Sequence, residues 1–166
     1  MDILVDASGW LAGPDGRLRC ALGRGGVRSD KREGDGATPT GCFPLREALY
    51  RADRLAAPVT ALPLRPIAET DGWCDDPADP ESYNRPVTLP HPAGHERMWR
   101  EDGLYDLVVV LGHNDSPPVP GLGSAIFLHV ARPGLAPTEG CVALPLPDLL
   151  ALVARCVPGD RLCVRL

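Results

Sequence analysis

Glycine and proline set the first limit on how this chain can fold. The sequence contains 18 glycines and 19 prolines among 166 residues, together more than a fifth of the chain. Because proline is excluded from helix interiors and from central strands, such a chain cannot hold many long helices. Short strands joined by many turns are the expected arrangement. We therefore predict a mainly β fold.

Short apolar runs bounded by turn residues mark the predicted strands, at residues 3–5, 17–22, 43–45, 107–111, 125–130 and 161–166. Pro14, Asp15 and Gly16 form a strong turn signal, which predicts an N-terminal hairpin or meander. Residues 47–54 fit a short helix or a strand equally well. The best helix candidate is 146–155, where apolar residues recur at helical spacing and Pro147 and Asp148 occupy the first turn.

Length and composition predict a single domain over residues 1–166. The chain is long enough for one core, and its 44% hydrophobic and 23% charged residues are typical of globular proteins. A proline-rich insert covers about 57–95, and residues 71–80 within it are expected to form a long surface excursion. Trp73, Tyr83 and Trp99 lie in or beside it, which favours a packed, substrate-facing insert over a disordered one.

Charge and hydropathy exclude several classes of partner. The net charge is −5 and no basic stripe is visible, which argues against nucleic acid. No run of about 20 apolar residues predicts a membrane span. The N-terminus carries acids and lacks the basic region and apolar core of a signal peptide.

The six cysteines contain no CxxC pair, so neither a zinc ribbon nor a thioredoxin-like motif is predicted. An even number permits disulfides, but a domain of this size does not need them. We expect most of the cysteines to be small buried hydrophobic side chains. Cys156 and Cys163, which flank a turn in apolar surroundings, fit this expectation.

One stretch carries the pattern of a reactive thiol. An apolar run ends at His129, and Thr138, Glu139, Gly140 and Cys141 follow, with the cysteine twelve residues after the histidine. A free thiol has a pKa of about 8.5 and needs a nearby base, for which histidine is the best suited side chain. Glycine permits a sharp turn that aims the Gly140 and Cys141 N–H groups at an oxyanion. We predict Cys141 as nucleophile and His129 as base of an acyl transfer.

Two motifs resemble a known family. His129 with Thr138 to Val142 resembles the His…[Ser/Thr]-x-Gly-Cys-[Ile/Val] signature of the L,D-transpeptidase catalytic domain (YkuD type). The segment from Lys31 to Phe43 is similar to that family's Lys…Gly-Asp…Thr-Pro-x-Gly-x-Phe segment. The resemblance covers roughly residues 1–166. It implies a mixed sheet or β-sandwich with one or two short helices, one of them following the cysteine.

The same resemblance implies a function on bacterial peptidoglycan. The cysteine attacks a carbonyl of an L-configured centre in a donor stem peptide, and an amine of an acceptor stem peptide resolves the thioester into a cross-link. It implies acylation by carbapenem-type β-lactams, no cofactor, no metal, and action in the periplasm or cell envelope. Glu139 stands where members commonly have His or Ser, and Ala143 where many have Arg or Asn. These departures indicate a divergent subfamily and leave the donor carbonyl open.

Further polar and aromatic residues are candidates for binding or orienting the substrate. Each of them fits a purely local structural role as well. They are His113, Thr138, Glu139, Arg97, Trp99 and Tyr83.

Three alternative functions compete with cross-linking. An L,D-carboxypeptidase would hydrolyse the same acyl-enzyme, and a peptidoglycan-binding module would lack catalysis. A zinc peptidase would use His91, His95, His113 or His129, but proline and glycine between His91 and His95 disfavour a helical ligand pair.

Overall fold

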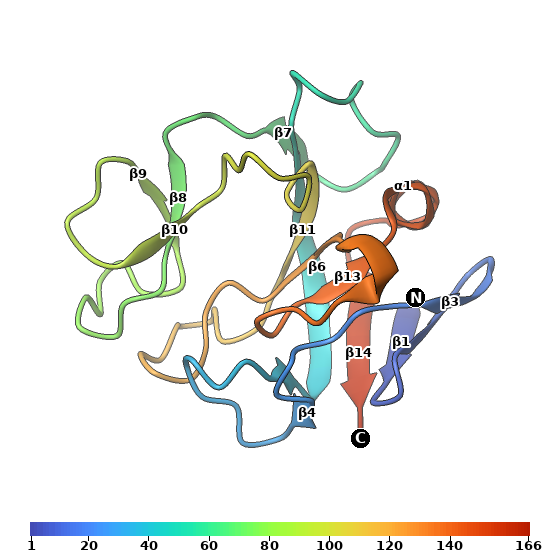
Figure 1. The fold of residues 1–166 in the computed structure, drawn as a ribbon, viewed down its shortest axis with the longest axis horizontal. Coiled ribbons are helices and arrows are strands. Elements are labelled where there is room, and N and C mark those ends of the chain that lie inside the picture. Colours follow the sequence, from blue (N-terminus) through green and yellow to red (C-terminus); the bar gives the residue numbers. More distant parts are fainter.

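The computed structural model describes residues 1–166 and is organised around a nine-stranded mixed sheet (Figure 1). Its strand order is β13-β12-β11-β6-β14-β1-β2-β3, and β7 pairs with β6 outside this path. The pairs β1–β14, β12–β13 and β6–β7 are parallel, and the others are antiparallel. The strands are β1 (Asp2–Asp6), β2 (Trp10–Gly13), β3 (Gly16–Arg19), β6 (Gly41–Tyr50), β7 (Leu64–Pro66), β11 (Leu107–Leu111), β12 (Phe127–Val130), β13 (Val142–Leu144) and β14 (Arg161–Arg165). The prediction of a mainly β fold with a mixed sheet is confirmed.

Strand β11 shows why these runs form the centre of the sheet. All five of its residues are buried, as expected for a strand covered on both faces. Leu107, Val109 and Leu111 belong to the larger hydrophobic cluster, whereas Val108 and Val110 belong to a second cluster on the opposite face. Cys141 lies in this second cluster. Because side chains alternate between the two faces of a strand, Cys141 lies on the face of the sheet that Val108 and Val110 cover.

The two edges of the sheet come together beside that cysteine. Ala21, just after β3, exchanges two backbone hydrogen bonds with Ala143 of β13, at 2.8 and 3.0 Å. Thr138 also bridges to Gly23. The sheet is therefore nearly closed, and the loop that carries Cys141 lies at the closure.

A second, smaller sheet occupies the proline-rich region. Strand β8 (Asp71–Cys74) pairs with β9 (Pro86–Thr88) and β10 (His95–Arg97), and Figure 1 shows these strands apart from the large sheet. These strands were not predicted, because strands of three or four residues are too short to show an alternation in the sequence. Trp73 anchors this sheet, with its ring centroid 5.0 Å from that of Phe127.

Helices are few. The α-helix α1 (Leu146–Val153) follows β13 and buries Leu149, Leu152 and Val153, so the predicted helix is confirmed but ends two residues early. A 3-10 turn, η1 (Pro133–Leu135), and a two-stranded sheet of β4 (Val27–Arg28) and β5 (Thr38–Pro39) complete the fold. None of the helices is long and apolar enough to span a membrane. Residues 47–54, which were ambiguous, lie in β6 as far as Tyr50.

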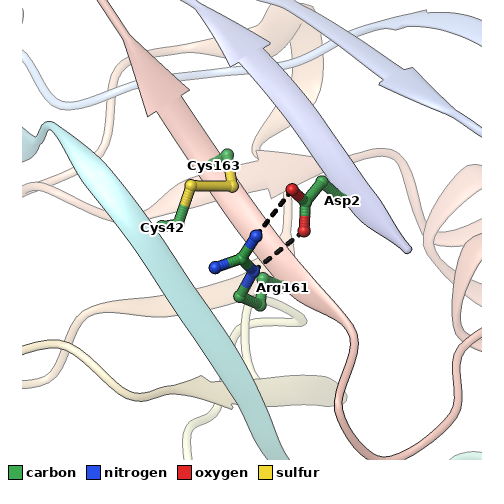
Figure 2. The surroundings of a disulfide bond; sticks show 4 residues. All are labelled: Asp2, Cys42, Arg161 and Cys163. Carbon is green, nitrogen blue, oxygen red and sulfur yellow. Dashed lines mark hydrogen bonds and ion pairs between the residues drawn. A yellow bond between two sulfur atoms is a disulfide. The ribbon is translucent and has the colours of Figure 1, made fainter.

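A disulfide joins β6 to β14. Figure 2 shows Cys42 bonded to Cys163, which are directly opposite each other in the strand register. Arg161 beside them forms two hydrogen bonds with Asp2 of β1, at 2.9 and 2.8 Å. The expectation that Cys163 is a free buried thiol was wrong, because its partner is 121 residues away in the sequence. The other four cysteines are free and buried, as predicted for most of them.

Candidate active site

The loop before β13 requires glycine next to Cys141. Gly140 has a φ of 134°, a conformation that residues with a side chain rarely adopt. A Cβ atom at this position would lie 2.8 Å from the carbonyl oxygen of Ala37. Both the positive φ and the lack of room for a Cβ atom therefore require glycine immediately before Cys141.

The second sequence motif, from Lys31 to Phe43, packs against this loop and supports it. The Asp35 carboxylate accepts the Ala37 N–H at 2.9 Å, and the Ala37 carbonyl lies against Gly140. Thr38 Oγ1 lies 3.4 Å from the Cys141 carbonyl oxygen, to which it donates a hydrogen bond. The segment from Lys31 to Thr38 therefore fixes the position of the cysteine loop. Both sequence motifs thus serve to position Cys141.

The Cys141 thiol is buried and held by backbone groups. The Phe127 N–H donates to Sγ, and the thiol donates to the Ala125 carbonyl, both at 3.3 Å. Ala125 has a φ of 52°, and its own N–H donates to Asn84 Oδ1 at 3.0 Å. Burial, with a smaller contribution from Glu96, raises the pKa of Cys141 to about 12. The resting group is therefore a thiol and not a thiolate.

His129 of β12 is a buried, neutral imidazole. Its Nδ1 lies 2.8 Å from the Val130 carbonyl oxygen, which can only accept, so Nδ1 carries the proton and Nε2 is the basic nitrogen. Burial lowers the pKa of His129 to about 4, and the positive charges of Arg100 and Arg132 act in the same direction. Nε2 forms no hydrogen bond with the protein. At neutral pH this ring is a proton acceptor with an open lone pair.

The register of the sheet directs both side chains to one cavity. His129 is paired with Ala143 in the parallel β12–β13 ladder, and Cys141 is two residues before Ala143 on the same side of the chain. Both residues line a cavity of about 410 Å³. No hydrogen bond joins Sγ to the imidazole. The structure thus brings the predicted pair together as a thiol and a free base in one space.

One wall of this cavity is acidic. Glu33, Asp75 and Glu96 all line it, although they come from three separate segments. Burial raises the pKa of Glu96 to about 6, and burial followed by the charge of Glu33 raises the pKa of Asp75. The carboxylates are therefore close enough to repel one another, and a positively charged ligand would relieve this repulsion.

Tyr105 connects the acidic wall to the imidazole. Its hydroxyl donates to Glu96, and its ring packs edge to face against His129 with centroids 5.4 Å apart. Burial, and next the charge of Glu96, raise the pKa of Tyr105 well above its usual value. Tyr105 therefore stays protonated and remains a hydrogen-bond donor to Glu96.

Three arginines also line the cavity, but only one lacks a protein partner. Arg24 pairs with Glu139 at 2.9 Å, and Arg100 forms two hydrogen bonds with Asp102 at 2.8 and 2.7 Å. Arg132 is exposed, and its side chain forms neither a hydrogen bond nor an ion pair. It is the arginine whose guanidinium is open to an anionic ligand.

The two predicted oxyanion donors differ in their availability. The Gly140 N–H donates to Thr138 Oγ1 at 3.1 Å, and the same hydroxyl donates to the Cys141 carbonyl at 2.7 Å. The Cys141 N–H donates no hydrogen bond within the protein. Only the amide of the cysteine itself is thus open to a developing oxyanion.

The other predicted residues are distributed unevenly. Thr138 and Glu139 line the cavity. Tyr83 lies behind the acidic wall and donates its hydroxyl hydrogen to Glu33 at 2.7 Å. Arg97 lines a separate surface depression, and Trp99 lies under the guanidinium of Arg51, 3.6 Å from the ring centroid.

His113 also lies outside the cavity lining. Its ring packs edge to face against Phe43, with centroids 5.3 Å apart, and its Nε2 is 3.3 Å from the Leu122 carbonyl oxygen. Burial lowers the pKa of His113. The structure therefore places this histidine beside the support of the cysteine loop and not beside Sγ.

Sequence reasoning missed the residues that give the cavity its charge. Glu33, Asp75, Glu96 and Arg132 lie far apart in the sequence, where a charge is ordinarily a solvated surface group. Tyr105 carried one weak signal, since it stands just before the apolar run of β11. Only the fold brings these residues to one place.

Comparison with known proteins identifies the family of this chain. The family model of the YkuD L,D-transpeptidase catalytic domain matches residues 4–164. Similar solved structures include L,D-transpeptidase 3 from Mycobacterium tuberculosis in complex with a faropenem-derived adduct, at 14% identity and a TM-score of 0.47, covering 99% of this chain and 60% of that one. An L,D-transpeptidase from Mycobacterium tuberculosis H37Rv gives 13% identity, a TM-score of 0.46, and coverage of 99% and 57%. The chain thus spans about three fifths of these proteins, and no curated sequence matches it. The match over nearly the whole chain shows that it belongs to the YkuD family of L,D-transpeptidase catalytic domains.

Proposed function

We propose that this protein is a peptidoglycan L,D-transpeptidase that cross-links stem peptides through a thioester on Cys141. The observation that carries the proposal is the neutral His129, whose basic Nε2 opens into the cavity that Cys141 lines. A neutral imidazole beside a protonated thiol is the pair that general-base activation of cysteine requires. Because the proposed substrate is peptidoglycan, we expect the protein to act in the periplasm or cell envelope.

The chemistry proceeds in two acyl transfers. As Sγ attacks the donor carbonyl, the thiol proton passes to Nε2 of His129 and the oxyanion is bound by the Cys141 N–H. The tetrahedral intermediate collapses to the thioester, and the departing amine takes the proton from the imidazolium. The acceptor ammonium group first gives one proton to a carboxylate of the acidic wall. The neutral amine then attacks the thioester, gives its next proton to His129 and expels the Cys141 thiolate, which the imidazolium reprotonates.

The acidic wall favours an amine over water as the second nucleophile. Stem-peptide acceptors carry an amino group that is cationic at neutral pH, and Glu33, Asp75 and Glu96 offer the opposite charge in the same cavity. The donor bears carboxylates, for which Arg132 is the unpaired cation. Transfer therefore fits the charge pattern better than the L,D-carboxypeptidase reaction, which needs no cationic acceptor.

Product analysis tests the proposal directly. Purified disaccharide peptides are incubated with the wild-type protein and with Cys141→Ala, and the products are identified by mass spectrometry. Cross-linked dimers from the wild type alone are the expected result, whereas trimmed monomers alone would indicate hydrolysis. Unchanged substrates would refute the enzymatic function and favour a binding module. Incubation with a carbapenem is expected to add its mass at Cys141 and nowhere else.

A further inference from the structure

A cysteine, an aspartate and a histidine come together in the small sheet, outside the cavity of Cys141. Cys74 is the last residue of β8, Asp79 lies in the loop between β8 and β9, and His91 lies between β9 and β10. One ligand atom from each of the three residues lies within 4.8 Å of the other two. Cys74 is fully buried, whereas the other two side chains reach the surface.

The spacing of these atoms is close to that of a metal site. His91 Nε2 is 3.1 Å from Asp79 Oδ2. In a tetrahedral zinc site, bond lengths of about 2.0 to 2.3 Å separate the ligand atoms by about 3.5 Å. The histidine and the carboxylate already lie at nearly this distance. The sulfur lies within 4.8 Å of both atoms, so a shift of at most about 1 Å brings it to this separation.

A backbone group orients one of the three ligands. The Ser82 N–H lies 3.4 Å from Asp79 Oδ1, the carboxylate oxygen that does not face His91. Hydrogen bonds of this kind are the usual outer shell of a metal site, because they hold the ligands in place before the ion binds.

The fourth ligand of a tetrahedral ion would be water, or His95 after a movement of its ring, since only Cys74, Asp79 and His91 have ligand atoms that already lie together. His95 is the direct cross-strand partner of Cys74 in the β8–β10 pair, so the two side chains lie on the same face of the sheet. Its ring centroid is 6.0 Å from that of His91. Its Nδ1 is bonded to the Ala93 carbonyl at 2.8 Å, which leaves Nε2 available.

We propose that Cys74, Asp79 and His91 bind one Zn²⁺ ion. Sulfur and imidazole ligands together select zinc or a similar transition metal, because Ca²⁺ and Mg²⁺ prefer oxygen ligands alone. The ion would tie both loops of the small sheet to β8. Asp75, next to Cys74, lines the cavity of Cys141, so the site would also fix one carboxylate of the acidic wall.

Cobalt binding tests the site with a signal that depends on the thiolate. Tag-free protein carrying Cys141→Ala, so that the other cavity thiol is absent, is freed of metal with a chelator and titrated with Co²⁺. We expect thiolate-to-cobalt absorption that saturates at one ion per chain and disappears when Zn²⁺ is added. Asp79→Asn and His91→Gln, in the same background, are each expected to weaken binding roughly tenfold or more. Cys74→Ser should abolish the absorption band, and Cys156→Ser is the matched control that leaves it unchanged.

Two results would overturn the proposal. One is the absence of a saturable band in protein whose circular dichroism shows that it is folded. The other is retention of the wild-type affinity in both Asp79→Asn and His91→Gln, which are partly exposed positions where folding is not at risk. Replacement of His95 by glutamine separates the two options for the fourth ligand, since only a coordinating histidine changes the shape of the cobalt spectrum.

Discussion

The burial of His129 makes a quantitative prediction about acid stability. An unfolded chain protonates this histidine near the ordinary pKa of 6.5, whereas the folded protein does so only near 4. Between these values the unfolded state binds more protons, so stability falls as the pH is lowered. From pH 7 to pH 5 the loss from this one group is about 2 kcal/mol, and it approaches about 3 kcal/mol below pH 4.

The measurement must separate the contribution of His129 to the free energy of unfolding from that of Glu96, because the two contributions change in opposite directions as the pH falls. Burial raises the pKa of Glu96 from 4.5 to about 6, so acidification to pH 5 returns about 1 kcal/mol to the folded state. Urea unfolding of the wild type and of His129→Gln, followed by tryptophan fluorescence at pH 7, 6 and 5, cancels this contribution in the difference. The stability advantage of the wild type over the variant should shrink by about 2 kcal/mol between pH 7 and pH 5.

A control and a refuting result complete this experiment. Leu128→Val removes one buried methylene group from the same strand and should cost a similar amount at every pH, because it does not titrate. A difference between wild type and His129→Gln that stays constant from pH 7 to pH 5 would show that the imidazole titrates normally in the folded protein. The assignment of a neutral base with a suppressed pKa would then be wrong.

Three further predictions concern the cavity. Gly140→Ala should destabilise the protein by roughly 1–3 kcal/mol in urea unfolding and misplace the thiol. Gly121 also has a positive φ, but a Cβ there meets no neighbour within 4 Å. Gly121→Ala therefore measures the cost of the dihedral angle without that of the clash. Glu96→Gln should lower the pKa of Cys141 and speed its alkylation by iodoacetamide at pH 8, while the proportion of dimers among the products falls; slower alkylation would contradict the assigned role of its charge. Arg132→Gln should raise KM for the donor peptide with little change in kcat, because it removes a binding charge, and an unchanged KM would exclude that contact.

The sequence predicted features whose signals are local. The apolar runs of β11 and β12, the first turn of α1 and the Gly-Cys pair each carry their pattern within a few residues. The disulfide between Cys42 and Cys163 carries no such pattern, because it depends on the register of two strands far apart in the chain. The acidic wall escaped prediction for the same reason. The small sheet was missed because its strands are too short to show a period.

Ala143 departs from the sequence pattern of the family, and this departure affects which residues can recognise the substrate. Ala143 is buried, and its backbone pairs with both His129 and Ala21 at the closure of the sheet. Its methyl side chain carries no charge, whereas the pattern that this sequence resembles commonly has Arg or Asn at this position. A positive charge for the donor must therefore come from elsewhere in the cavity. Arg24 and Arg100 are already neutralised by Glu139 and Asp102. If the proposed function holds, donor recognition has moved from the strand after the cysteine to Arg132, beyond the end of β12.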